Sequence, residues 1–175
     1  MTAFRPCPRS DARRFVAEHH SHHRAHVGEV FAIGLYDADL LAVVVVGRPV
    51  AVSLDDASTL EVTRLCVGPS APPFAASQLL GRAWRAASAM GCERLVSYTR
   101  LDERGTCYRA AGWVPTALVE PRPHDNAAGG NRASRWLPGM FEPSTEPVWR
   151  VRWEIGPGAS TGRIDVTAER QRRCA

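Results

Sequence analysis

The feature that most constrains the fold is a helical pattern enclosed by two strand patterns. Residues 75–90 repeat their apolar side chains at helical spacing, and Gly91 follows as a suitable helix end. Residues 59–67 (TLEVTRLCV) precede this helix and residues 93–100 (ERLVSYTR) follow it, each with the composition of a strand. A helix that joins two strands is typical of a parallel pair, so we expect these strands in one sheet.

The other patterns belong to the same sheet and its covering helices. We expect helices over residues 11–22 and 105–111, and strands over residues 30–36, 40–46, 113–120 and 148–155. A meander followed by a strand–helix–strand unit predicts an α/β (α+β) fold with a mixed, mostly antiparallel sheet and helices on both faces.

One domain accounts for most of the chain. We assign residues 1–155 to it, including an irregular loop at 121–147 that is rich in proline, glycine and arginine. Residues 156–175 carry few apolar side chains, so we expect a flexible C-terminal tail there.

The basic residues are all arginine. The chain has 22 of them and no lysine, which excludes a Schiff-base lysine, a Walker A lysine and a lysine general base. The net charge of +4 and the isoelectric point of about 9.1 favour an anionic partner, such as a nucleotide-bearing cofactor, a nucleic acid or an acidic carrier. A solvated arginine-rich surface is the alternative.

Two further observations concern location. The longest apolar run, residues 40–46, is far shorter than the roughly 20 residues of a membrane span, and the first residues do not resemble a signal peptide. The five cysteines are scattered without a CxxC pair. We therefore expect a cytoplasmic protein with reduced thiols and no membrane contact.

The strand at residues 59–67 changes phase. Leu60 and Val62 point to one face of a regular strand and Leu65 to the other, and a β-bulge near residues 63–64 would resolve the conflict. The strand also carries Glu61 and Arg64. They are either a structural ion pair or a functional pair, in which Glu61 acts as general base or orients a histidine and Arg64 binds a carboxylate or phosphate.

Five of the six histidines lie between His19 and His26. Four of them fall on one helical face, a spacing that suits a metal, but the chain offers no convincing further ligand, so we expect no metal site. One or two histidines acting as acid or base, or touching substrate, is the preferred interpretation. A partly exposed polar helix end is an equal alternative.

The loop GPSAPPFAAS connects the central strand to the long helix. Backbone N–H groups at a helix start form a cradle for anions, and the prolines leave the usable donors at Phe74, Ala75, Ala76 and Ser77. An ordinary connecting loop is equally consistent with this composition.

The stretch Tyr108-Arg-Ala-Ala-Gly112-Trp113, between a short helix and a strand, resembles a motif of the GNAT superfamily of N-acyltransferases. The resemblance also covers the strand end Leu65-Cys66-Val67 and the loop and helix after it. It implies a central splay, a gap between the strands at 59–67 and 93–100 that admits a pantetheine arm. It further implies that Leu65, Cys66 and Val67 line the cofactor and that Tyr108 protonates a leaving thiolate.

The pyrophosphate loop of that superfamily, R/Q-x-x-G-x-G/A, is replaced here by GPSAPPFAAS. The replacement shifts weight from acyl-CoA toward a carrier-protein phosphopantetheine or an aminoacyl-tRNA as acyl donor.

A narrower resemblance rests on HxHHR (residues 20–24), VGRPVA (46–51), TLEVTRLC (59–66), Ser77, Tyr98-Thr99 and RAAGW (109–113). These residues are similar to small phage and actinobacterial GNAT-like proteins related to the Mom family of DNA-modification acyltransferases. The resemblance implies that the histidine segment borders the acceptor cleft, with His22 and His23 as candidate acid/base residues. His20, Arg24, Arg64 and Tyr98 are the candidate substrate contacts.

The resulting functional prediction is an N-acyltransferase that moves an acyl group to an amine acceptor, in a natural-product pathway or elsewhere. A Mom-like DNA base-modification enzyme and a non-catalytic binding module of the same fold are the alternatives. A small-molecule amine is the expected partner. An acyl carrier protein, tRNA, DNA and a second copy of the chain remain open.

Overall fold

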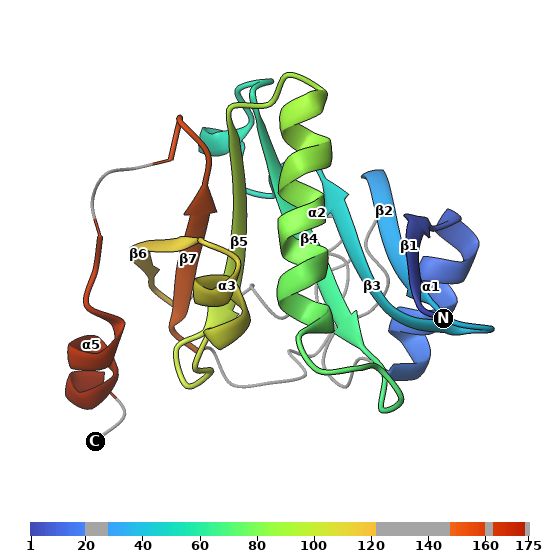
Figure 1. The fold of residues 1–175 in the computed structure, drawn as a ribbon. Helices are drawn as coiled ribbons and strands as arrows, with labels where there is room; N and C mark the ends of the chain where they lie inside the picture. The colour runs from blue at the N-terminus through green and yellow to red at the C-terminus, as the bar shows by residue number, and fades with distance from the viewer. Residues whose placement is uncertain (20–27, 122–147, 160–162, 174–175) are drawn as a thin grey trace, which may run out of the picture.

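The computed structural model describes residues 1–19, 28–121, 148–159 and 163–173. Their strands form one sheet in the order β1-β2-β3-β4-β5-β7-β6 (Figure 1). The strands are β1 (Ala3–Pro6), β2 (Glu29–Tyr36), β3 (Leu40–Gly47), β4 (Thr59–Val67), β5 (Arg94–Arg100), β6 (Val114–Val119) and β7 (Arg150–Ile155). The helices are α1 (Arg9–His19), the single 3₁₀ turn η1 (Val52–Leu54), α2 (Ala75–Ala89), α3 (Thr106–Ala110) and α5 (Val166–Arg173).

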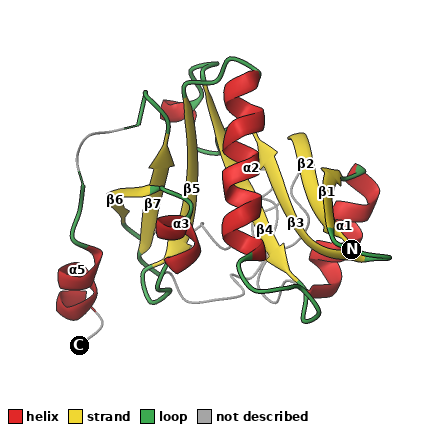
Figure 2. Cartoon of the chain, in the orientation of Figure 1, coloured by secondary structure: helices red, strands yellow, loops and turns green. Residues whose placement is uncertain are grey.

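The sheet is mixed and mostly antiparallel, as the sequence predicts. Strands β4 and β5 pair in parallel and the long helix α2 connects them, whereas the other described pairs are antiparallel. Figure 2 shows α2 and α3 on one face of the sheet and α1 on the other. The predicted three-layer arrangement is therefore confirmed.

Each face of the sheet has its own core. Alternate residues of β3 divide between them, because successive side chains of a strand point to opposite faces. Val44 and Val46 pack with Leu79 and Leu80 of α2, while Val43 and Val45 pack with the apolar side of α1. This double burial explains why β3 is apolar throughout.

The N-terminal strand β1 was not predicted. It is a four-residue edge strand that pairs with β2 from Ala3 opposite Tyr36 to Pro6 opposite Ile33. Proline is tolerated there because an edge strand has one side without a partner. Only Phe4 would have indicated a strand, and the Arg82 guanidinium lies 3.5 Å above its ring.

The C-terminal region also differs from the prediction, because a helix lies where we expected a flexible tail. Asp165 accepts hydrogen bonds from the N–H groups of Thr167 and Ala168, which caps the start of α5. Val166 is buried, and Arg170 donates to the carbonyl oxygens of Leu101 and Glu103. Polar anchoring of this kind leaves no apolar periodicity in the sequence.

The predicted helix over residues 11–22 is present as α1, which ends at His19 where the described segment ends. The predicted irregular loop at 121–147 lies outside the described residues, except for its first residue. Within the described part of the chain, none of the helices has the length and apolar character needed to span a membrane.

Candidate active site

The centre of the sheet contains a β-bulge at the position that the sequence indicates. Val45 of β3 pairs with Arg64, but the next residue, Val46, pairs with Val62, so Thr63 is the extra residue. The bulge brings Leu65 onto the same face as Leu60 and Val62, where it packs against the core beneath α2. The phase conflict of the strand is thereby resolved.

The predicted splay begins at this bulge. Strands β4 and β5 pair only from Thr59 to Val62 and from Arg94 to Ser97. Beyond these residues β4 remains paired with β3, and β5 with β7, but the two strands no longer pair with each other. We call this gap the splay. It is bordered by residues 63–67 of β4 and 98–100 of β5.

The main chain of β4 faces the splay at alternate residues. Gly68 donates its N–H to the carbonyl oxygen of Leu41, 2.9 Å away, so its main chain points toward β3. In an antiparallel pair this direction alternates, which turns Cys66 toward β3 as well and turns Leu65 and Val67 toward the splay. The main-chain N–H and C=O groups of Leu65 and Val67 therefore point into the splay.

Glu61 lies immediately before the splay, on the face covered by α1. Its side chain is enclosed, with 6% exposed, and its Oε2 accepts a hydrogen bond of 2.9 Å from the N–H of Val50. Burial raises the pKa of Glu61 to about 7, against weaker opposing effects of that hydrogen bond and of Arg150 and Arg64. A carboxyl group with this pKa exchanges protons at neutral pH, as a general base must.

Other polar side chains from β4, β5 and β7 share the face of Glu61. Paired residues of adjacent strands point to the same face, and the registers of Glu61 with Val96, of Val96 with Glu154 and of Tyr98 with Arg152 therefore align them. We call this set the polar face: it consists of Glu61, Arg64, Tyr98, Arg150, Arg152 and Glu154.

Arg64 and Tyr98, which remain predicted substrate contacts, lie near Glu61. Arg64 interacts electrostatically with Glu61 and donates to the carbonyl oxygen of its neighbour Thr63, and burial lowers its pKa. Burial raises the pKa of Tyr98, and Glu61 adds to the rise. Arg150 lies 5.9 Å from the centre of the Tyr98 ring. The polar face thus combines two carboxyl groups, a phenol and three guanidinium groups.

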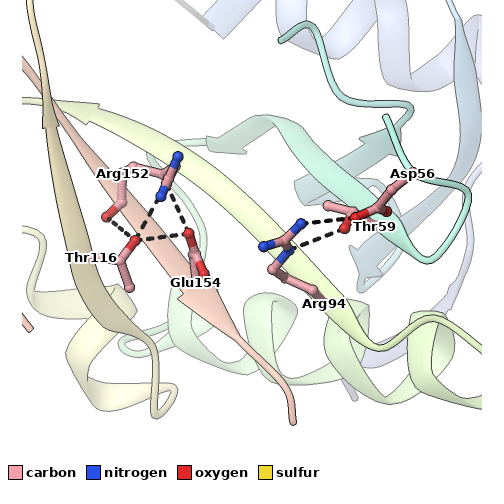
Figure 3. Close-up of polar contacts among 6 residues, drawn as sticks. All are labelled: Asp56, Thr59, Arg94, Thr116, Arg152 and Glu154. Carbon is pink, nitrogen blue, oxygen red and sulfur yellow. Dashed lines mark hydrogen bonds and ion pairs between the residues drawn. The ribbon is translucent and has the colours of Figure 1, made fainter. Parts of the chain in front are cut away.

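A buried ion pair forms the outer part of this face (Figure 3). Arg152 Nε lies 2.8 Å from Glu154 Oε1, and the Thr116 hydroxyl donates to the same oxygen at 2.9 Å. Glu154 is fully buried, with an exposed fraction of 0%. A buried carboxylate requires such partners, and here it fixes the direction of the Arg152 side chain.

Tyr108 lies on the opposite face of the sheet from Glu61. Its ring stacks on Trp153, with centroids 5.3 Å apart, and meets the edge of Trp113 at 5.5 Å. Its hydroxyl lies 2.8 Å from the Ser97 hydroxyl, which in turn donates to the carbonyl oxygen of Val62 at 3.1 Å. Burial raises the pKa of Tyr108 above its ordinary value.

The predicted anion cradle lies at the start of α2. Phe74 precedes the helix with a left-handed φ of 66° and a side chain that is 76% exposed. The N–H of Ala75 donates to Pro72 and that of Gln78 to Phe74, so the donors of the first turn without a main-chain partner in the described structure are those of Ala76 and Ser77. The Ser77 hydroxyl donates to Phe74 at 3.0 Å.

Cys66 differs from its neighbours in the predicted cofactor set. Its side chain is buried in the core beneath α1, and its main chain faces β3 instead of the splay. Burial also raises the pKa of its thiol, which keeps the thiol protonated and unreactive. Only Leu65 and Val67 of this set have their main chain directed at the splay.

Most of the predicted histidine segment lies outside the described part of the chain. His20, His22, His23 and Arg24 lie outside the described residues. His19 is described, and its ring packs against Phe15 at 4.4 Å. Among the described residues no three histidine, cysteine or carboxylate side chains gather closely enough to hold a metal.

Sequence reasoning missed several members of the site. The strict alternation of residues 150–155 (RVRWEI) indicates a strand and also places Arg150, Arg152 and Glu154 on one of its faces. No sequence pattern indicates the hydrogen bond from Val50 to Glu61 or the contacts of the Ser97 hydroxyl, because both depend on the register between distant strands.

The fold is similar to that of solved acetyltransferases. IAA acetyltransferase from Bacillus cereus aligns with a TM-score of 0.62 at 11% identity, over 89% of this chain and 99% of that one. The ribosomal-protein-S18-alanine N-acetyltransferase from Escherichia coli aligns with a TM-score of 0.62 at 9% identity, over 94% and 99%. A Bacillus subtilis acetyltransferase in complex with CoA aligns with a TM-score of 0.56 at 13% identity, over 89% and 99%.

At these identities the likeness establishes the fold, which is the GNAT fold that the Tyr108–Trp113 motif predicts. No match to the chain was found among the curated proteins. A family model described as the Mom protein family matches residues 1–129, which include the bulge, the splay, Glu61 and Tyr108. The chain therefore belongs to the Mom protein family.

Proposed function

We propose that this Mom-family protein transfers an acyl group from a thioester donor to an amine, with Glu61 as the general base. The observation that carries the proposal is the carboxyl group of Glu61, buried at the start of the splay with its pKa raised to about 7. The fold agrees with acyl transfer, because the structures it resembles are acetyltransferases.

Residues of this chain can serve each step of the proposed acyl transfer. The donor enters the splay, and the amine nitrogen approaches from the polar face and attacks the thioester carbonyl carbon. The N–H groups of Leu65 and Val67 are the candidates to stabilise the resulting oxyanion, since both face the splay. The carbon–sulfur bond then breaks, the sulfur leaves with the bonding electrons, and the proton of the amine passes to Glu61.

The donor is best tested by direct binding. We expect acetyl-CoA to bind the wild-type protein in isothermal titration calorimetry and to release free thiol in the presence of an amine. The Glu61→Gln variant should bind the donor with similar affinity and release thiol at least 100-fold more slowly. Absence of binding at millimolar acetyl-CoA would reject the CoA form of the proposal. An acylated phosphopantetheine carrier would then be tried as the thioester donor, and an aminoacyl-tRNA as an oxygen-ester donor in its place.

A second candidate concerns the acceptor. Membership of the Mom family, together with the guanidinium groups of Arg64, Arg150 and Arg152 on the polar face, supports an amine of a DNA base. We expect duplex DNA to be retarded in a gel-shift assay at low salt and released as salt rises. After reaction, mass spectrometry of the digested nucleosides should detect a base that carries the acyl group. DNA that stays unbound at low salt would argue against this acceptor.

The same experiments also test the alternative that the protein is a non-catalytic binding module. Binding of donor and DNA without release of thiol and without a modified base would indicate a binding module that retains the fold alone.

A further inference from the structure

A side-chain hydrogen bond marks the place where β4 and β5 separate. Val62 and Ser97 are the last residues paired between the two strands. At this pair the Ser97 hydroxyl donates to the carbonyl oxygen of Val62, with 3.1 Å between the two oxygens. The bond therefore joins the strands at the inner end of the splay, where the main-chain ladder stops.

The direction of the neighbouring hydrogen bond follows from this one. A serine hydroxyl has a single hydrogen, and a carbonyl oxygen can only accept. Because Ser97 donates to Val62, the 2.8 Å contact between the Ser97 and Tyr108 hydroxyls requires Tyr108 to be the donor. The phenolic proton of Tyr108 is thus directed at Ser97.

The surroundings of Tyr108 hold it in this position. Its side chain is 5% exposed and lies between the rings of Trp113 and Trp153. The N-terminal end of its helix α3 is also fixed, because a Cβ atom added at Gly105 would lie 2.3 Å from the Trp153 ring. The Tyr108 hydroxyl is therefore engaged with Ser97 within a packed core.

We propose that Ser97 and Tyr108 are positioning residues that fix the inner end of the splay, and that Tyr108 does not protonate the leaving group. The chain of hydrogen bonds runs from Tyr108 through Ser97 to Val62 and sets how far β4 and β5 separate. The inference rests on the proposed acyl transfer for its kinetic consequences.

The transfer remains balanced without a proton from Tyr108. The carbon–sulfur bond breaks and the sulfur leaves as a thiolate with the bonding electrons. A cysteine thiol has a pKa of about 8.5, and a thiolate is a far weaker base than an amine anion, so the thiolate leaves unprotonated and takes its proton from water afterwards. The proton of the attacking amine goes to Glu61, as in the proposed function.

Three variants test the proposal: Ser97→Ala, Tyr108→Phe and the double variant. The matched controls are Ser88→Ala, at an exposed position of α2, and Tyr36→Phe, at a buried tyrosine in the core beneath α1. Both test substitutions remove one hydroxyl and keep the remaining side chain, so the aromatic packing of Tyr108 is retained.

The kinetic measurement separates positioning from proton transfer. Each single variant should raise the dissociation constant and the KM for the donor about three- to tenfold, the loss expected for one hydrogen bond, with kcat and its pH profile retained. The double variant should be no weaker than either single variant, because the two hydroxyls act through one chain. The proposal is overturned if Tyr108→Phe lowers kcat 100-fold and changes its alkaline limb while donor binding and the Ser97→Ala enzyme stay unaffected.

A second measurement does not depend on activity. Amide hydrogen exchange over Thr59–Val62 and Arg94–Ser97 should be faster in all three variants than in the wild type and in the two controls. Unchanged exchange would overturn the positioning role even in an active enzyme. Conversely, faster exchange in a protein that binds no thioester would support the positioning role and reject the proposed acyl transfer.

Discussion

Glu61 and Glu154 lie in one row of the sheet, on either side of Val96, but they are held by different partners. Glu154 bonds directly to the guanidinium group of Arg152, whereas Glu61 accepts its hydrogen bond from the uncharged N–H of Val50. A contact with a backbone N–H offsets less of the cost of burying a charge than a contact with a cation does. This difference makes Glu61 the carboxyl group suited to proton transfer.

The first prediction concerns the rate and its pH dependence. Because Glu61 must be ionised to accept a proton, we expect the rate to rise with pH through an apparent pKa of about 7. Glu61→Gln should reduce the rate 100- to 10,000-fold, by about 3 to 5 kcal/mol of activation free energy, and abolish this rise. The measurement is kcat/KM from pH 5 to pH 9, with the exposed Glu93→Gln as control. A rise that persists in Glu61→Gln would assign the base to another group.

The second prediction concerns stability, which depends on pH in the opposite direction. Folding raises the pKa of Glu61 from about 4.5 to about 7, so the folded state binds this proton more tightly than the unfolded state. The resulting stabilisation is complete below pH 4.5 and is lost as the pH rises through 7. Relative to Glu61→Gln, the wild type should lose up to about 3 kcal/mol of unfolding free energy between pH 4.5 and pH 8. Urea unfolding of both proteins at several pH values measures the difference, and a constant difference would contradict the raised pKa.

The third prediction compares two glycines that both have a left-handed φ. A Cβ atom at Gly105 would lie 2.3 Å from the Trp153 ring, whereas one at Gly112 would meet nothing within 4 Å. Gly112→Ala should therefore cost only the backbone strain, about 1 kcal/mol. Gly105→Ala adds overpacking and should cost about 2 to 4 kcal/mol in total. Urea unfolding of the two variants checks the order, and equal losses would show that α3 can move away from Trp153.

The fourth prediction compares a buried and an exposed ion pair. Arg152→Met removes the guanidinium group that lies 2.8 Å from the fully buried carboxylate of Glu154, and should lower the unfolding free energy by about 3 kcal/mol. Arg100→Met breaks the exposed pair of Arg100 with Asp102, which should cost less than 1 kcal/mol. Thermal unfolding in low and high salt measures both. A small loss in Arg152→Met would mean that water or another group reaches Glu154.

Much of the fold follows from residue patterns. The apolar face of α2, the uniformly apolar β3 and the phase change in β4 each have a local signature, and together they predict a mixed sheet with a bulge near residues 63–64. The structure places this bulge at Thr63. Strand β1 and helix α5 lack such a signature. Phe4 is the single large apolar residue of β1, and α5 is held by the Asp165 cap and by Arg170 instead of an apolar face.

The candidate site likewise contains some residues that a local pattern indicates and others that it does not. Glu61 and Arg64 stand out because charged residues are rare in a strand covered on both faces. The partners that determine their chemistry come from β5 and β7 and from the residue Val50, and they are brought close by strand register. Register between distant strands is a property of the whole sheet, so no local pattern could have indicated these contacts.

The short pairing of β4 with β5 has a mechanical consequence. In the described structure, the main-chain seam between the β1–β4 part of the sheet and the part formed by β5, β6 and β7 consists of four residue pairs and of the hydrogen bonds from Glu93 and Arg94 to Ser58, with α2 packed across it. A donor bound at the splay, as proposed, would contact both parts at once and resist their separation. Because such a donor binds only when both parts are folded together, it should raise the unfolding temperature of both parts of the sheet.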